Sequence, residues 1–133
     1  MDVGDHASRS RLVVAEDIVR FTAMTGDRNP LHYDEAVAAA SRFGGIIVQG
    51  GVTTGLLNAL VAEDLPGPGS VFLNVNWDFR APTRPGDVIT AHGEVVSVHA
   101  TKPICTMRTW ITNQDDVVLV EGTAVVYREP LAG

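Results

Sequence analysis

The chain has 133 residues, of which 45% are hydrophobic and 20% are charged, and its formal net charge is -6 at pH 7. This length fits one domain, and the composition is that of a globular protein, which excludes a disordered chain. No apolar run reaches the roughly 18 residues of a transmembrane helix, and the N-terminus lacks the pattern of a secretory signal. We therefore expect a single cytoplasmic domain over residues 1–133, with residues 1–9 loosely ordered.

The charges and the single cysteine narrow the kinds of site that the chain can hold. Lys and Arg are scattered along the sequence, which argues against a nucleic-acid surface but permits a small ligand that carries phosphate. Cys105 stands alone, which excludes an internal disulfide and a cysteine-based zinc site. We expect no metal, no cofactor, and neither a nucleic acid nor a membrane as a partner.

The first half of the chain predicts short helices separated by loops. A strand over residues 11–14 is followed by a helix whose apolar residues keep helical spacing and stop at Gly26. A turn over residues 26–30 then leads to an alanine-rich helix over residues 35–41, with Asp34 as its N-cap.

A further helix is predicted over residues 51–63. Gly51 and Gly55 each lower its intrinsic helix propensity by about 1 kcal/mol, so packing must hold it. Small residues also permit close approach of another backbone. This segment is therefore interpreted as a buried central helix.

From Ser70 onward the apolar residues recur with a period of two, which is typical of half-buried strands. Short turns separate four predicted strands, over residues 71–79, 88–98, 104–112 and 117–127. Sequential strands with short turns predict an antiparallel meander. Together with the central helix, they predict an α+β domain whose sheet curls around that helix.

Residues 25–32 read Thr-Gly-Asp-Arg-Asn-Pro-Leu-His. This segment resembles the signature Gly/Glu-Asp-x-Asn-Pro-Leu-His of the MaoC-like dehydratases and (R)-specific enoyl-CoA hydratases. The similarity extends to the region of Gly50, to the turn over residues 65–69, and to the Phe-x-x-Pro-x-x-x-Gly-Asp segment over residues 79–87. The family has the hot-dog fold, which agrees with the order of a helix followed by a sheet.

The resemblance implies roles for particular residues. Asp27 and His32 correspond to the catalytic pair of the family, and Gly50 to the glycine whose backbone N–H binds the thioester oxygen. Asn29 and Asn58 are expected to position water or substrate.

Three positions depart from the family pattern. The chain has Gln49, Gly50 and Gly51 where the family usually reads His-Gly-Met, and Asn58 replaces a common serine. These changes leave the catalytic pair intact and bear on the substrate range.

Such residues suit the hydration of an α,β-unsaturated thioester. The reaction needs water activated for attack at C3, a proton for C2, and donors for the enolate oxygen. A histidine with a pKa near about 6.5 can shuttle a proton at neutral pH, and a carboxylate can hold the water. Asp27 and His32 are assigned jointly as the acid/base pair, and a helix N-terminus near Gly50 would supply the N–H donor.

Other interpretations remain open from the sequence. The Gly-Asp-x-Asn-Pro segment also favours an ordinary turn, and Arg80, Arg84 and Lys102 are either surface residues or contacts for coenzyme A phosphates. The alternative functions are a hot-dog thioesterase and a non-catalytic or partner-dependent subunit of a heteromeric dehydratase. A homodimer or higher oligomer is expected because unpaired sheet edges are usually covered. The thioester carrier is either coenzyme A or acyl carrier protein.

Overall fold

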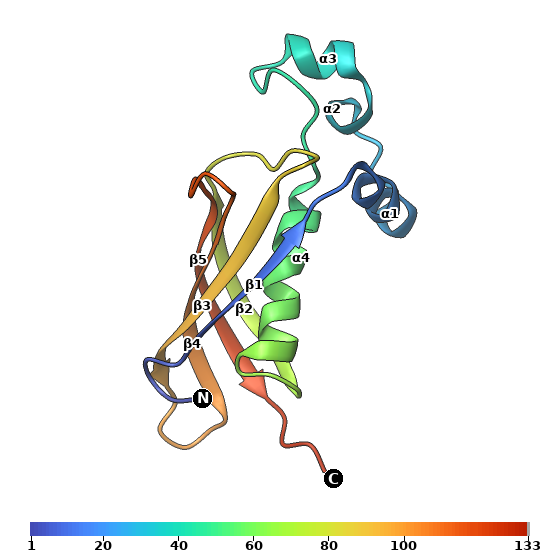
Figure 1. Cartoon of the computed structure of the whole chain (residues 1–133). Coiled ribbons are helices and arrows are strands. Elements are labelled where there is room, and N and C mark those ends of the chain that lie inside the picture. The colour runs from blue at the N-terminus through green and yellow to red at the C-terminus, as the bar shows by residue number, and fades with distance from the viewer. Residues whose placement is uncertain (133) are drawn as a thin grey trace.

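The structure is a computed structural model that describes residues 1–132. A five-stranded antiparallel sheet curls around one helix, α4, and three short helices project beyond one end of the sheet (Figure 1). The strands are β1 (His6–Leu12), β2 (Ser70–Phe79), β3 (Val88–Val98), β4 (Ile104–Thr112) and β5 (Val118–Arg128). The helices are α1 (Ala15–Thr25), α2 (Pro30–Tyr33), α3 (Glu35–Ala40) and α4 (Gly50–Ala59), the last continued by a π-helical turn, Leu60–Asp64.

The order of the strands is β1-β3-β4-β5-β2. Strands β3, β4 and β5 form the predicted meander, but the prediction of a continuous meander is wrong for β2, which pairs with β5 at the far edge. Residues 80–87 are long enough to cross the end of the sheet, and on the way the Arg80 N–H donates to the Leu119 carbonyl at 2.8 Å. On its other side, β3 pairs antiparallel with β1.

The N-terminus differs from its prediction. Residues 6–9, expected to be loosely ordered, belong to β1, which pairs with β3 from His6 opposite Glu94 to Leu12 opposite Val88. Almost all side chains of β1 are exposed, so the strand carries no apolar periodicity. Its order comes from backbone pairing, which the pattern of side chains does not reveal.

The core lies between α4 and the concave face of the sheet, as predicted for a buried central helix. Leu57 and Leu60 of the helix pack among the inward side chains of Ile89 and Ile111, and all four are fully buried. A Cβ at Gly93 would lie 2.9 Å from both Leu60 and Met107, so this glycine allows the close approach of helix and sheet.

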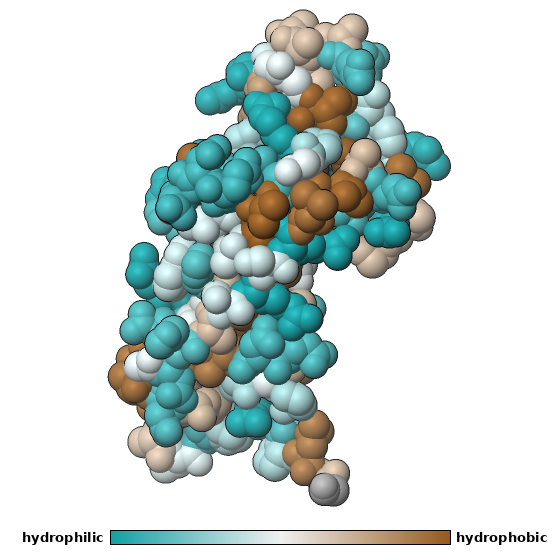
Figure 2. All heavy atoms as spheres, in the orientation of Figure 1, coloured by the Kyte–Doolittle hydropathy of each residue, from teal (hydrophilic) through white to brown (hydrophobic). Residues whose placement is uncertain are grey.

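The three short helices form a separate layer that carries the signature segment (Figure 1). Helix α1 ends at Gly26, whose φ of 82° lies in the left-handed region that glycine adopts readily. Asp34 caps α3 as predicted, since its carboxylate accepts from the N–H groups of Ala36 and Val37. Figure 2 shows apolar surface gathered on this part, between α1 and the segment that leads to α4.

Candidate active site

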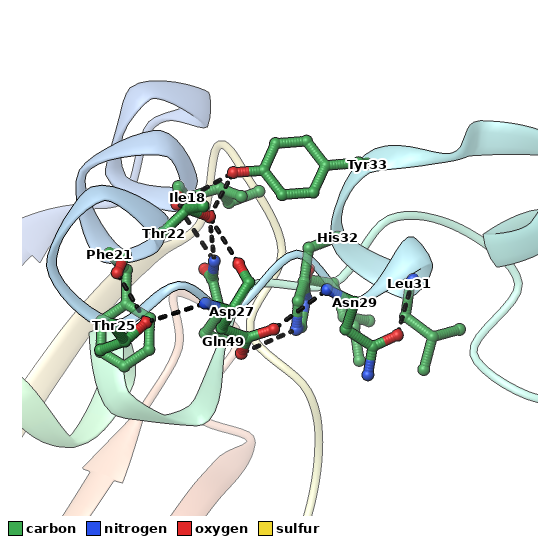
Figure 3. Close-up of polar contacts among 11 residues, drawn as sticks. Ile18, Phe21, Thr22, Thr25, Asp27, Asn29, Leu31, His32, Tyr33 and Gln49 are labelled. Atoms are coloured by element: carbon green, nitrogen blue, oxygen red, sulfur yellow. Dashed lines mark hydrogen bonds and ion pairs between the residues drawn. The ribbon is translucent and has the colours of Figure 1, made fainter.

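The signature segment folds back on itself through two consecutive side-chain turns. The Asp27 carboxylate accepts from the Asn29 N–H at 3.0 Å, and the Asn29 side chain accepts from the Leu31 N–H at 3.1 Å, which caps α2. Pro30 opens that helix, where its missing N–H costs nothing. The turn of helix brings the His32 ring back to Asp27, with Nε2 3.7 Å from Oδ2 (Figure 3).

The His32 ring is held in one orientation. Its Nδ1 lies 2.7 Å from the carbonyl oxygen of Ile47, and because a carbonyl only accepts, Nδ1 donates. In the neutral ring Nε2 is then an acceptor that faces the Asp27 carboxylate. Two acceptors at 3.7 Å do not bond to each other, but a water molecule placed between them could donate to both.

The two members of the pair differ in exposure. The side chain of His32 is 8% exposed and that of Asp27 is 37% exposed. A small molecule therefore reaches the carboxylate from solvent and meets the imidazole at the inner end of the site.

A buried hydroxyl fixes the backbone of Asp27. Oγ1 of Thr22 lies 2.7 Å from the Asp27 carbonyl oxygen, is also contacted by the Tyr33 hydroxyl, and lies 3.4 Å from Nε2 of Gln49 (Figure 3). A hydroxyl has one proton and two lone pairs. Donation from Tyr33 and Gln49 to Thr22, and from Thr22 to Asp27, satisfies these groups together. The sequence reasoning missed Thr22 and Tyr33, because no motif joins residues that far apart.

Gln49 is the link between this cluster and α4. It is 2% exposed, and its Nε2 donates to the Ile18 carbonyl at 3.0 Å. Its Oε1 is buried without a hydrogen-bond partner among residues 1–132. Gln49 was noted in the sequence only as a departure from the family pattern, and the structure gives it a contact with Thr22.

Gly50 is the first residue of α4, so the N–H groups of this turn have no partner within the helix. The segment before it is anchored on both sides: the Ile47 N–H donates to Leu31 and the Val48 N–H to Thr83, at 3.2 and 2.8 Å. The carbonyl that holds His32 is thus three residues before Gly50. A Cβ on Gly50 would approach the Phe79 ring to 3.0 Å, so the absence of a side chain keeps this end of the helix open.

Gly51 has a different neighbour. A Cβ built on it would overlap the ring of Phe21, which projects from α1. The Phe21 ring therefore occupies the space that a side chain at position 51 would need.

The remaining predicted site residues lie elsewhere or are already engaged. Asn58 is exposed and lines a hollow of about 420 Å³ between α4 and β2, together with Thr54 and Trp77. In the part of the chain that the structure describes, no hydrogen bond joins Asn58 to Asp27 or to His32. The Asn29 side chain serves as the cap of α2, so the roles of both asparagines toward water or substrate stay predictions.

At the start of α1, Asp17 has the one carboxyl whose pKa is clearly shifted among the described residues. Burial raises the pKa of Asp17, but hydrogen bonds from the Val14 N–H and from Arg11 and Arg20 outweigh this and lower it below its usual value. Asp17 thereby fixes the start of α1. Among residues 1–132 no group of three or more potential ligands could hold a metal ion, and no helix there is long and apolar enough to cross a membrane.

Comparison with known proteins decides the family. The model of the MaoC like domain matches residues 4–116. The chain belongs to the MaoC-like family. This MaoC-like chain is 38% identical over 126 residues to an (R)-specific enoyl-CoA hydratase of Aeromonas caviae. The aligned region covers 95% of the chain and 94% of that protein.

Two solved structures place the MaoC-like chain among hydratases of known fold. An (R)-hydratase from Aeromonas caviae involved in PHA biosynthesis superposes with a TM-score of 0.91 at 37% identity, over 97% of this chain and 98% of the other. An unliganded R-hydratase of Pseudomonas aeruginosa superposes with a TM-score of 0.88 at 32% identity, over 100% of this chain and 89% of the other. The predictions of the hot-dog fold and of an enzyme family of hydratases and dehydratases are confirmed.

Proposed function

We propose that this MaoC-like protein adds water to trans-2-enoyl-CoA to give (R)-3-hydroxyacyl-CoA, and catalyses the reverse dehydration. The observation that carries the proposal is the pair of acceptors, His32 Nε2 and Asp27 Oδ2, that face each other at 3.7 Å. The choice of the (R) product is supported by the names of the relatives, which are (R)-specific hydratases.

The mechanism follows from the geometry of the pair. Water held between Asp27 and His32 loses a proton to the pair as its oxygen attacks C3 of the enoyl group. The electrons of the double bond move toward the thioester carbonyl, and the pair returns a proton to C2. Asp27 and His32 act as one acid/base unit in both steps.

The start of α4 supplies the second element of catalysis. The negative charge that develops on the thioester oxygen is stabilised by the N–H of Gly50, because the first turn of a helix has free N–H groups and a positive dipole end. Loss of one such donor slows reactions of this type by about 100- to 1000-fold.

The edge of the sheet supports a homodimer as the working form. Strand β2 lies at the edge, and its Val71, Leu73, Val75 and Phe79 side chains are exposed. An apolar edge strand invites pairing with another chain. A second copy of this chain covers that edge in the proposed dimer. Equilibrium sedimentation of the purified protein tests it, and a monomer at assay concentration contradicts it.

The activity is tested with purified protein and crotonyl-CoA, by following loss of the enoyl absorbance. The Asp27→Asn and His32→Gln variants should each lower kcat by at least about 100-fold, with unchanged thermal unfolding. Asp115→Asn and His6→Gln are matched controls, since both residues are exposed and lie in other parts of the chain. They should retain full activity.

Four results would contradict the proposal. Full activity in both site variants excludes the acid/base pair, and an (S)-3-hydroxy product excludes the stereochemistry. Release of free thiol without hydration indicates a thioesterase instead. Activity that arises only after a second, different subunit is added supports the heteromeric alternative.

A further inference from the structure

A cavity of about 540 Å³ opens beside the start of α4. Gly50 and Ile47 form part of its wall, so it adjoins the proposed thioester site, and Arg42, Arg80 and Arg84 also line it. Among the described residues of this wall there is no aspartate and no glutamate. This concentration of positive charge stands out in a chain whose formal net charge is -6.

Two of these arginines lack a carboxylate partner within residues 1–132. The Arg84 guanidinium donates to the backbone carbonyls of Phe43 and Ile46, which are neutral. Arg42 is exposed and lies 6.0 Å from the centre of the Phe43 ring. Only Arg80 is neutralised, by ion pairs with exposed acids.

A second cavity, of about 550 Å³ between α1 and α4, provides a contrast. It is also lined by three arginines, but each forms an ion pair: Arg9 with Asp64 at 3.1 Å, and Arg11 and Arg20 with Asp17 at 2.5 and 3.2 Å. Its positive charge is therefore satisfied inside the protein, whereas that of the first cavity is left for a ligand.

We infer that the cavity lined by Arg42 and Arg84 binds the phosphate groups of a coenzyme A carrier; this inference rests on the proposed function. A guanidinium presents five N–H donors, and in Arg84 the two backbone carbonyls leave several of them free. Planar guanidinium groups bind phosphate oxygens in pairs, with charge-assisted hydrogen bonds. A concave wall suits a small carrier rather than the surface of a carrier protein.

The fold allows one ligand to reach both the start of α4 at Gly50 and the cavity lined by Arg42 and Arg84. The segment that carries Arg42 descends from α3 to the start of α4, and the loop with Arg84 crosses the end of the sheet to meet it (Figure 1). The hollow between α4 and β2 that Gly51, Asn58 and Trp77 line has no charged residue among the described ones. The two hollows therefore differ in charge, and only the one lined by arginines suits phosphates.

The test compares thioesters whose carriers differ in the number of phosphates, coenzyme A having its adenosine group in addition. Crotonyl-CoA, crotonyl-4′-phosphopantetheine and crotonyl-pantetheine are assayed with the wild type, Arg42→Gln and the control Arg9→Gln, which removes the same charge from the neutralised cavity. We expect Arg42→Gln to raise KM for crotonyl-CoA about threefold to tenfold at unchanged kcat. It should leave KM for crotonyl-pantetheine unchanged, and Arg9→Gln should change neither.

Several outcomes in the KM measurements overturn the inference. In Arg42→Gln these are an equal rise of KM with the phosphate-free thioester, no rise with crotonyl-CoA, or a larger rise with an acyl carrier protein thioester than with crotonyl-CoA. An equal rise of KM in Arg9→Gln overturns it as well. Calorimetry can measure the binding of free coenzyme A and, separately, of pantetheine. These measurements need no turnover, so they separate this inference from the proposed function. Weaker binding of coenzyme A alone in Arg42→Gln and Arg84→Lys supports it, even in a protein that hydrates nothing.

Discussion

Two parts of the molecule differ in the contacts that stabilise them: the sheet with α4, and the layer of short helices. Around α4, fully buried apolar side chains such as Leu57, Ile89 and Ile111 fill the space, and hydrophobic burial has no preferred direction. Around the signature segment, the Thr22 hydroxyl and the Gln49 amide hold Asp27 in place through hydrogen bonds, which are directional. Most of the apolar core and the hydrogen bonds that hold the Asp27 and His32 pair therefore lie in different parts of the molecule.

The largest expected effect on stability comes from the first part. Leu57→Ala removes a fully buried side chain from the centre of α4 and should lower the free energy of unfolding by about 2–5 kcal/mol. Because the Asp27 and His32 contacts lie in the other layer, kcat measured well below the melting temperature should stay within about threefold of wild type. Urea unfolding and the crotonyl-CoA assay check this, and a collapse of kcat in folded protein would break the comparison.

The reverse pattern is expected for Thr22→Val, which keeps the shape and removes the hydroxyl. The Asp27 carbonyl and the Gln49 amide each lose a partner, at a cost of about 1–3 kcal/mol in stability. A shift of the Asp27 loop by a fraction of an ångström should lower kcat by about 10- to 100-fold. Thr22→Ser, which retains the hydroxyl, is the matched control and should recover most of the activity.

A smaller effect is expected at the start of α1. Asp17→Asn removes a charge that accepts from the Val14 N–H and pairs with two arginines, and should cost about 1 kcal/mol at neutral pH. The pKa of Asp17 is lowered in the folded state, so its contribution is complete above the usual pKa of 3.8 and is lost as the pH falls toward the folded value. Melting temperatures of the two proteins should converge between neutral and acidic pH. A constant difference down to the lowest pH would show that the charge is irrelevant.

The smallest effect is expected for Asn58→Ser. Asn58 is exposed and lies in the uncharged hollow beside β2, outside the hydrogen bonds of the Asp27 and His32 pair. Activity with crotonyl-CoA should change by less than about threefold, as for a surface substitution. A series of enoyl-CoA chain lengths measures whether preference shifts. A large fall of kcat with every chain length would place Asn58 in the catalytic machinery.

Local patterns in the sequence predicted the elements whose determinants are local. The period of two located β3 and β4 at their observed bounds. Gly26 marked the C-terminal end of α1, and Asp34 marked the start of α3. The contact between Asp27 and His32 was predictable because they lie five positions apart in the sequence, across a turn that contains a proline.

Contacts between distant segments were not predictable in the same way. The pairing of β2 with β5 depends on where a crossing loop ends, and β1 pairs through its backbone alone. Thr22 and Gln49 lie 27 residues apart, and each has an ordinary role when considered alone. The charge of the cavity beside Gly50 likewise depends on which arginines find a carboxylate, a question that only the fold answers.

The overlap between Phe21 and position 51 couples two helices at the level of single side chains. Helix α1 supplies the bulk at this contact, and α4 has a glycine. A larger side chain at position 51 would have to displace the Phe21 ring, and a smaller residue at position 21 alone would leave a void. A larger residue in place of Gly51 should therefore be accommodated best as a double exchange, together with a smaller residue in place of Phe21.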